Sequence, residues 1–178
     1  MHKNLVLREW KNEETWIEFW NDNEKAKTQR KNCDSCRLLI YTDLLNRKDE
    51  ILFFYPYNCW KTYANLGNWK VSLNCVAELY SCFPSYSLHG KFKKSEENSD
   101  IYIYSSSRKE ALEWKQRLLY ALKRVREVEP SFEVRIRKGC EAYESVFGPW
   151  QFWKERMKVK NYENVEEFLK EMEKQLEL

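Results

Sequence analysis

The segment of residues 100–138 constrains the fold of this chain more than any other. It begins with isoleucines that alternate with tyrosines, which is the period of a strand with one buried face. Ser106 or Ser107 can cap the long amphipathic helix that follows, and Pro130 stops that helix. Residues 132–138 then alternate between apolar and charged side chains, as in a second half-buried strand. We therefore predict a strand-helix-strand unit over residues 100–138.

The remaining elements follow from the same two periods. Trp16, Phe19 and Trp20 have the spacing of one helix face, and alternating apolar residues over 70–80 predict a strand in which Cys75 faces inward. The other predicted elements are helices over residues 13–26, 58–68, 141–147 and 164–176, a turn over 33–36, and strands over 5–7, 38–42, 50–57 and 86–92.

These elements predict an α+β domain with a largely antiparallel sheet of about five or six strands and helices on one face. A chain of 178 residues is long enough for one well-packed domain, whereas two domains of half that length would each be marginal. We therefore expect residues 1–178 to form a single globular domain. Asn164 and Glu167 have the spacing of a capping box, so we expect a helical tail, residues 149–178, packed on the body.

Glycine is scarce, and its scarcity excludes several classes of enzyme. The four glycines are too scattered for the phosphate loop of P-loop NTPases, the dinucleotide fingerprint of dehydrogenases or the nucleophile elbow of α/β-hydrolases. The chain also has no apolar run near the ~20 residues that a membrane span requires. We expect a cytoplasmic protein with no membrane partner and with its six cysteines reduced.

Basic residues are concentrated in the strand-helix-strand segment. The net charge of the chain is only +3, but residues 100–138 contain ten basic and six acidic side chains. Basic residues on a helix flank and a strand face can contact a phosphate backbone, and Tyr102 or Tyr104 beside them can stack on bases. The predicted phosphate contacts are Arg108, Lys115, Lys123, Arg126, Arg135, Arg137 and Lys138. The alternative is a solvated surface whose basic charges are neutralised by neighbouring glutamates.

Histidine and cysteine chemistry have few candidates in this chain. His89 and Tyr143 match in kind the metal-binding histidine and the nucleophilic tyrosine of replication nickases, although the second histidine of such sites is absent. Cys33 and Cys36 have the spacing of half a zinc site, and no second pair completes it. We expect no cofactor, with a structural zinc ion or a redox-active cysteine pair as alternatives.

Carboxylates offer a third chemical alternative. Glu78 and Asp100 lie in predicted strands, and with Lys91 or Lys93 they supply the groups of a metal-dependent nuclease. Their spacing matches no known motif, and an unpaired carboxylate in an apolar strand is costly unless it faces solvent. We therefore predict a non-enzymatic protein that binds nucleic acid, DNA or RNA, and keep a metal-dependent nuclease or nickase as an alternative.

The abundance of aromatic residues supports an alternative of another class. The chain has 11 Tyr, 9 Phe and 8 Trp, and aromatic residues that stay exposed are typical of protein interfaces. Trp150, Phe152 and Trp153 either form a partner-binding patch or pack back on the body. In this alternative the chain is a protein-interaction module or inhibitor that binds a protein partner or a second copy of itself.

Overall fold

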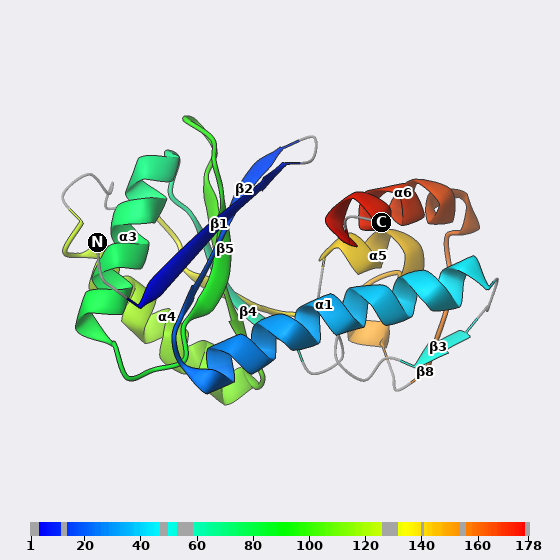
Figure 1. The fold of residues 1–178 in the computed structure, drawn as a ribbon, viewed down its shortest axis with the longest axis horizontal. Helices are drawn as coiled ribbons and strands as arrows, with labels where there is room; N and C mark the ends of the chain where they lie inside the picture. Colours follow the sequence, from blue (N-terminus) through cyan, green and yellow to red (C-terminus); the bar gives the residue numbers. More distant parts are fainter. Residues whose placement is uncertain are drawn as a thin grey trace. The chain divides into compact units, whose positions relative to one another are not determined.

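The computed structural model describes residues 4–11, 14–46, 50–52, 59–125, 132–139, 141–153 and 156–176 (Figure 1). The strands are β1 (Leu5–Lys11), β2 (Thr15–Asn21), β3 (Glu50–Leu52), β4 (Trp60–Asn65), β5 (His89–Lys93), β6 (Asp100–Ser105), β7 (Arg135–Lys138) and β8 (Arg156–Lys158). The helices are α1 (Glu24–Leu45), α3 (Trp69–Cys82), α4 (Arg108–Leu122), α5 (Glu141–Phe147) and α6 (Val165–Leu176), with short 3-10 helices η1 (Trp150–Phe152) and η2 (Tyr162–Asn164). In these residues no helix has an apolar stretch long enough to cross a membrane.

The chain divides into two compact units, each with its own hydrophobic core. The first contains residues 1–29 and 60–137, and the second contains residues 30–59 and 138–178. Helix α1 contributes its first residues to the first unit and the remainder to the second. A single domain over the whole chain stays a prediction.

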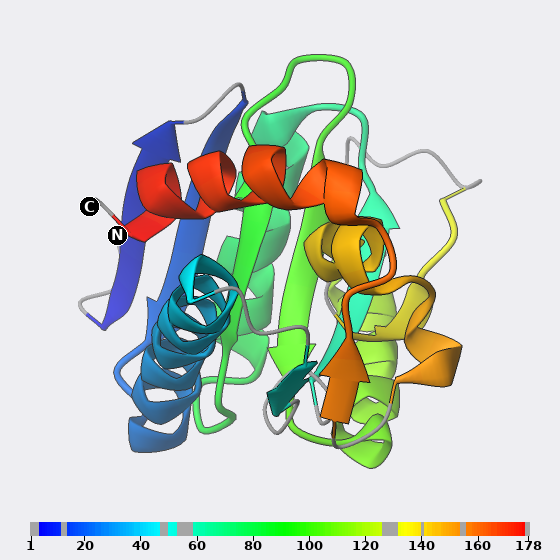
Figure 2. The ribbon, with the colours of Figure 1, turned by 90° about the vertical axis from the view of Figure 1, so that its right-hand side faces the viewer.

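The first unit is built on a six-stranded sheet in the order β1-β2-β5-β6-β4-β7 (Figure 2). The pairs β1 with β2, β2 with β5, β5 with β6 and β4 with β6 are all antiparallel. From β4 to β7 the chain follows the β-α-β-β-α-β motif known from ferredoxin-like folds, and the hairpin of β1 and β2 extends the sheet beyond β5. The predicted α+β class is confirmed, including the antiparallel sheet, the strand-helix-strand unit and the C-terminal helix.

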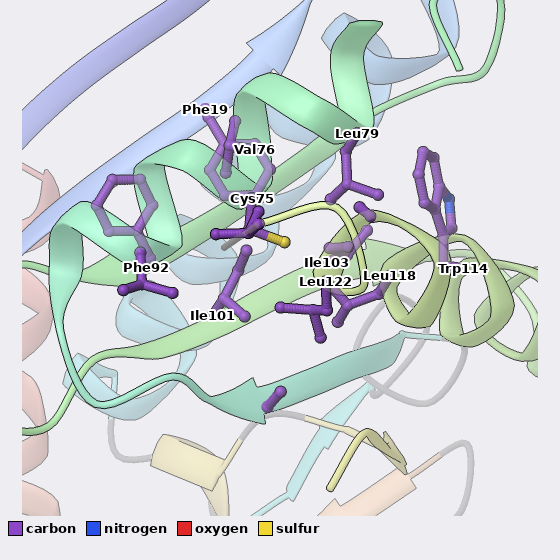
Figure 3. Close-up of a cluster of buried hydrophobic side chains, with 14 of the residues drawn as sticks. Phe19, Cys75, Val76, Leu79, Phe92, Ile101, Ile103, Trp114, Leu118 and Leu122 are labelled. Atoms are coloured by element: carbon purple, nitrogen blue, oxygen red, sulfur yellow. The ribbon is translucent and has the colours of Figure 1, made fainter. Parts of the chain in front are cut away.

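Helices α3 and α4 cover one face of this sheet and form the core of the first unit with it (Figures 1 and 3). Strand pairing aligns Phe19 with Gly90 and Gly90 with Ile103, so these residues share the face under the helices. Burying each large apolar side chain contributes about 1.5–3 kcal/mol. The largest buried side chains that Figure 3 labels are Phe19, Leu79, Phe92, Ile101, Ile103, Trp114, Leu118 and Leu122.

Helix α3 occupies a segment whose alternation predicted a strand over residues 70–80. It begins at Asn68, whose side chain accepts a hydrogen bond from the backbone N–H of Lys70 at 2.8 Å. Cys75 and Leu79 are one helical turn apart and both are fully buried, so the apolar residues here satisfy the helical period as well as the strand period. The predicted strand is wrong, and the predicted burial of Cys75 is confirmed.

Strand β2 occupies a segment whose spacing predicted a helix over residues 13–26. Ile17 and Phe19 join the core under the helices, whereas Trp16 and Trp20 alternate to the opposite face. A strand that is apolar on both faces lacks the polar and apolar alternation of a half-buried strand. The helical spacing of its aromatic residues was therefore misleading, and the predicted helix is wrong.

Three further segments differ from their predictions. Residues 33–36 and 38–42, predicted as a turn and a strand, lie inside α1, whose first half is polar and shows no apolar stripe. Residues 58–68, predicted as a helix, contain β4. Of the strand predicted over 50–57, residues 50–52 form β3 and the others lie outside the described residues.

The Cys75 thiol is expected to resist alkylation in the folded protein. Burial raises its pKa, and the neighbouring carboxylate of Glu78 raises it further, so the reactive thiolate is scarce at neutral pH. Cys82 lies on the same helix and is partly exposed. We expect iodoacetamide to modify Cys82 at least about tenfold faster than Cys75, as followed by peptide mass spectrometry, and the two rates to converge in denaturant. Equal rates in the folded protein would show that Cys75 is not buried.

The second unit packs the later part of α1 with α5, α6 and the antiparallel pair of β3 and β8. Its core includes Ile40 and Leu44 of α1 with Phe168 and Met172 of α6. Trp153 is also buried, and its Nε1 donates a hydrogen bond to the carbonyl of Gly148 at 2.8 Å. Within this unit, the apolar stripe of the C-terminal helix therefore packs inward.

Candidate functional site on the aromatic face of the sheet

The face of the six-stranded sheet opposite α3 and α4 is lined by aromatic and basic side chains. Antiparallel pairing aligns Lys91 with Glu18 and Tyr102, and Tyr102 with Tyr63, and residues aligned in this way share a face. We call this surface the aromatic face. Its aromatic and basic members are Arg8, Trp10, Trp16, Trp20, Lys61, Tyr63, His89, Lys91, Lys93, Tyr102 and Tyr104.

Lys91 lies among three aromatic rings. Its Nζ is 4.1 Å from the ring centroid of Trp16, 5.4 Å from that of Trp10 and 6.0 Å from that of Tyr102. Trp10 stacks on Trp16 with centroids 6.2 Å apart, and Tyr63 stacks on Tyr102 with centroids 5.8 Å apart. Each contact between an ammonium and a ring face contributes about 0.5–2 kcal/mol. The rings thus form a band across β1, β2, β6 and β4, and the ammonium of Lys91 lies among them.

A second row on the same face is buried and polar. Lys61 is 6% exposed, with Nζ at 5.5 Å from the ring centroid of Tyr102 and 5.6 Å from that of Tyr104. The rings of Tyr104 and His89 have centroids 4.9 Å apart. His89 Nε2 is 3.1 Å from Oε1 of Glu18, whereas Nδ1 is buried without a hydrogen-bond partner. The row therefore combines a mostly buried lysine with an imidazole of which only one nitrogen has a hydrogen-bond partner.

Arg135 of β7 adds a further cation at the edge of the aromatic face. Val134 belongs to the core, so the next residue, Arg135, points to the opposite side of the sheet. Its Nη2 donates a hydrogen bond to Oε2 of Glu133 at 2.5 Å. Hydrogen bonding to Glu133, and then to Tyr63, raises the pKa of Arg135 above its ordinary value. Arg135 is thus a permanent charge that meets the aromatic face at Tyr63.

The predicted phosphate contacts on the helix lie on the other side of the sheet from Arg135. Arg108 and Lys115 belong to α4, and Lys123 is its C-cap. Glu133 lies near both Arg135 and Lys115. Both cations lower the pKa of its carboxyl, Arg135 more strongly than Lys115. The basic set therefore does not form one uninterrupted patch. Arg137 and Lys138 are half-buried in β7, and Arg126 lies outside the described residues. The two tyrosines predicted to stack on bases, Tyr102 and Tyr104, both belong to the aromatic face.

A pocket near the start of α4 has charges that pair with each other. Its lining includes Lys25 and Glu110, whose side chains meet at 2.7 Å, and Glu113 and Arg117, which meet at 3.2 Å. Burial alone would raise the pKa of Glu110, but hydrogen bonds from Lys25 and Ser106 lower it below its usual value. These ion pairs neutralise four of the charged side chains in the lining, and Lys109 is the fifth.

Each candidate catalytic residue has its own contacts within its unit. His89 belongs to the first unit, where it contacts Glu18, and Tyr143 belongs to the second, where its hydroxyl is 3.8 Å from Sγ of Cys36. Glu78 lies on α3 and pairs at 2.9 Å with Arg124, which follows the C-cap of α4. Asp100 lies on β6 and accepts a hydrogen bond from Nδ2 of Asn65 at 3.0 Å.

Cys33 and Cys36 lie one turn apart on α1 rather than in a turn. Cys36 is buried, and Cys33 is partly exposed. Over the described ranges, no group of three or more His, Cys, Asp or Glu side chains is placed to hold a metal ion.

The residues that complete the aromatic face lie in segments whose element type was predicted wrongly. Trp16 belongs to β2, and Lys61 and Tyr63 belong to β4, both of which were predicted as helices. The available signal was alternation in residues 60–65, where buried Thr62 and Ala64 separate Lys61, Tyr63 and Asn65.

Comparison of the chain with protein-family models, with curated proteins and with solved structures gave no match.

Proposed function

We propose that this chain is a non-enzymatic, cytoplasmic protein that binds single-stranded nucleic acid on its aromatic face. Its main support is the band of Trp10, Trp16, Tyr102 and Tyr63 with the ammonium of Lys91 among the rings. Rings of this kind stack on unpaired bases with about 1–3 kcal/mol per base, while lysine and arginine contact the phosphates. Lys61, Lys91 and Arg135 supply those charges.

The layout of the first unit supports the same function. A sheet face with aromatic residues, opposite a layer of helices, is the surface that a common RNA-binding module uses to stack bases. Here the neighbouring strands β6 and β4 supply Tyr102 and Tyr63. This support is an analogy of layout, since folds of one topology serve many functions. The rings favour single strands because the faces of paired bases are already stacked inside a duplex.

Tyr102→Ala is expected to weaken binding of a single-stranded oligonucleotide about 5- to 100-fold, because the ring that stacks on a base is removed. Fluorescence anisotropy at one fixed salt concentration measures the change, and Tyr102→Phe, which keeps the ring, should bind nearly as well as the natural protein. Tyr120→Ala is the matched control, because Tyr120 lies on α4 and is 49% exposed on the other side of the sheet. Unchanged affinity of Tyr102→Ala, or no binding of DNA or RNA by the natural protein at low salt, would refute the proposal.

The same oligonucleotides distinguish the enzymatic alternative. A metal-dependent nuclease or nickase would cleave them in the presence of Mg²⁺ and stop when EDTA is added. A binding protein leaves them intact under both conditions.

One observation favours protein interaction as a second function. Phe152 of η1 is 77% exposed, although its neighbour Trp153 is buried in the second unit. Exposed aromatic side chains are typical anchors of protein interfaces. Light scattering that shows a stable oligomer of the natural protein, reduced to the monomer by Phe152→Ser, would support this function.

A further inference from the structure

We propose that Lys61 is the centre of a phosphodiester-binding site within the aromatic face. The site deepens the proposed function and rests on it for the source of the ligand, which would be one phosphate of the bound strand. Lys61 was not among the predicted phosphate contacts, because its segment was predicted as a helix.

The environment of Lys61 lacks a negative charge. Its ammonium contacts the rings of Tyr102 and Tyr104, and in the part of the chain that the structure describes it forms no ion pair. Other lysines of the sheet are paired: Lys93 with Glu14, and Lys94 with Glu9 at 2.8 Å. A buried cation is unfavourable unless an anion accompanies it, and ring contacts offset only part of the loss of hydration. Lys61 is therefore a lysine of this face whose charge an anionic ligand would satisfy.

The same row contains a second buried polar group. His89 is fully buried, and its Nδ1 has no hydrogen-bond partner among the described residues. Tyr104, which is aligned with Lys61, separates the lysine from His89. Buried polar atoms in native proteins are almost always satisfied, so the unsatisfied Nδ1 of His89 in the same row as Lys61 indicates a polar ligand.

The charge balance favours a singly charged ligand. Lys61 supplies one positive charge, and no carboxylate of the described residues pairs with it. The carboxylate of Glu18, 3.1 Å from His89, is aligned with Lys91 and Arg8 in the neighbouring row. A phosphodiester has one negative charge and therefore neutralises one lysine. The ring of Tyr102 beside Lys61 can stack on the base attached to the same nucleotide.

Lys61→Met tests this site, because methionine keeps the apolar stem between the two tyrosine rings and removes the charge. We expect single-strand affinity to fall about tenfold, and the slope of log K against log salt to become shallower by about 0.7, the value for one phosphate contact. Lys61→Arg should keep the slope. Lys94→Met is the control, since the charge of Lys94 is already paired with Glu9 at 2.8 Å, and its slope should not change.

Dimethyl phosphate, a monoanionic phosphodiester, separates the site from the function. At ten times its dissociation constant it should raise the Tm of the natural protein by about 3 °C relative to chloride of equal ionic strength, and should not raise that of Lys61→Met. If the natural protein binds no oligonucleotide but shows this difference, the site stands and the proposed function fails. A folded Lys61→Met variant with unchanged affinity and slope, or with the same response to dimethyl phosphate, overturns the site.

Discussion

Leu118→Ala is expected to lower the free energy of unfolding by about 3 kcal/mol, within the range of 2–5 kcal/mol for buried leucines. Leu118 lies in the middle of α4, is fully buried, and packs with α3 and the sheet in the core of the first unit (Figure 3). The shorter side chain leaves a cavity that this core cannot refill. Urea denaturation followed by circular dichroism measures the loss, which is a large part of the 5–15 kcal/mol typical of a domain.

Leu112→Ala is the matched control for this loss. Leu112 lies on the same helix and is 39% exposed, so the same truncation should cost less than about 1 kcal/mol. The two variants have the same change in helix propensity, and their difference isolates burial. Equal losses would contradict the orientation of α4 on the sheet.

The orientation of α4 was predictable from sequence because every local signal agreed. Ser107 accepts a hydrogen bond from the backbone N–H of Glu110 at 3.2 Å, as expected of an N-cap, and Trp114, Leu118 and Leu122 are buried at intervals of four residues. The helix ends at Leu122, earlier than predicted, and residues 126–131 lie outside the described residues. This helix could be predicted because the N-cap residue and the helical spacing of the apolar residues indicated the same element.

The element type could not be predicted for segments whose apolar residues fit both the helical and the strand period. In α3, alternate residues are apolar, yet the buried set includes Val71, Ser72, Cys75, Val76 and Leu79, which is a helical pattern. In β2, Trp16 and Trp20 lie on one face while Ile17 and Phe19 lie on the other, so no polar face marked a strand. Where two periods fit one segment, tertiary packing decides between them.

The aromatic face depends on strand order, which local sequence does not encode. Tyr102 and Tyr63 meet because β6 pairs with β4, and Lys91 meets Trp16 because β5 pairs with β2, across separations of tens of residues. Composition predicted that aromatic and basic residues act together, with Tyr102 and Tyr104 as the aromatic members, and that role stays a prediction. The lysines beside them, Lys61 and Lys91, become visible only once the strands are placed.

Gly90→Ala is expected to lower the free energy of unfolding by about 3 kcal/mol, at the upper end for overpacked cores. Gly90 has an ordinary backbone conformation, but a Cβ there would collide with the ring of Phe19 and with the carbonyl oxygen of Tyr102. Gly67→Ala is the contrasting variant, because Gly67 has a φ of +69° and open space around it. Backbone strain alone should make Gly67→Ala lose about 1–2 kcal/mol. Thermal and urea unfolding of both variants give the comparison.

A second substitution separates the two collisions at Gly90. Phe19→Leu removes the ring that the new methyl group meets, so the double variant should be more stable than the sum of the two single losses predicts, by about 1 kcal/mol. The collision with the Tyr102 carbonyl remains, so rescue is incomplete. Strict additivity would show that the ring of Phe19 does not lie over Gly90.

The collision at Gly90 should also reach the aromatic face, although Gly90 lies on the side under the helices. Its neighbour Lys91 is aligned with Tyr102, and a displaced β5 separates that lysine from the rings of Tyr102 and Trp16. We therefore expect Gly90→Ala to weaken oligonucleotide binding under conditions where it is still folded, and Gly67→Ala to bind as the natural protein does. If Gly90→Ala is folded and binds normally, the spacing of β5 and β6 does not set the geometry of the aromatic face.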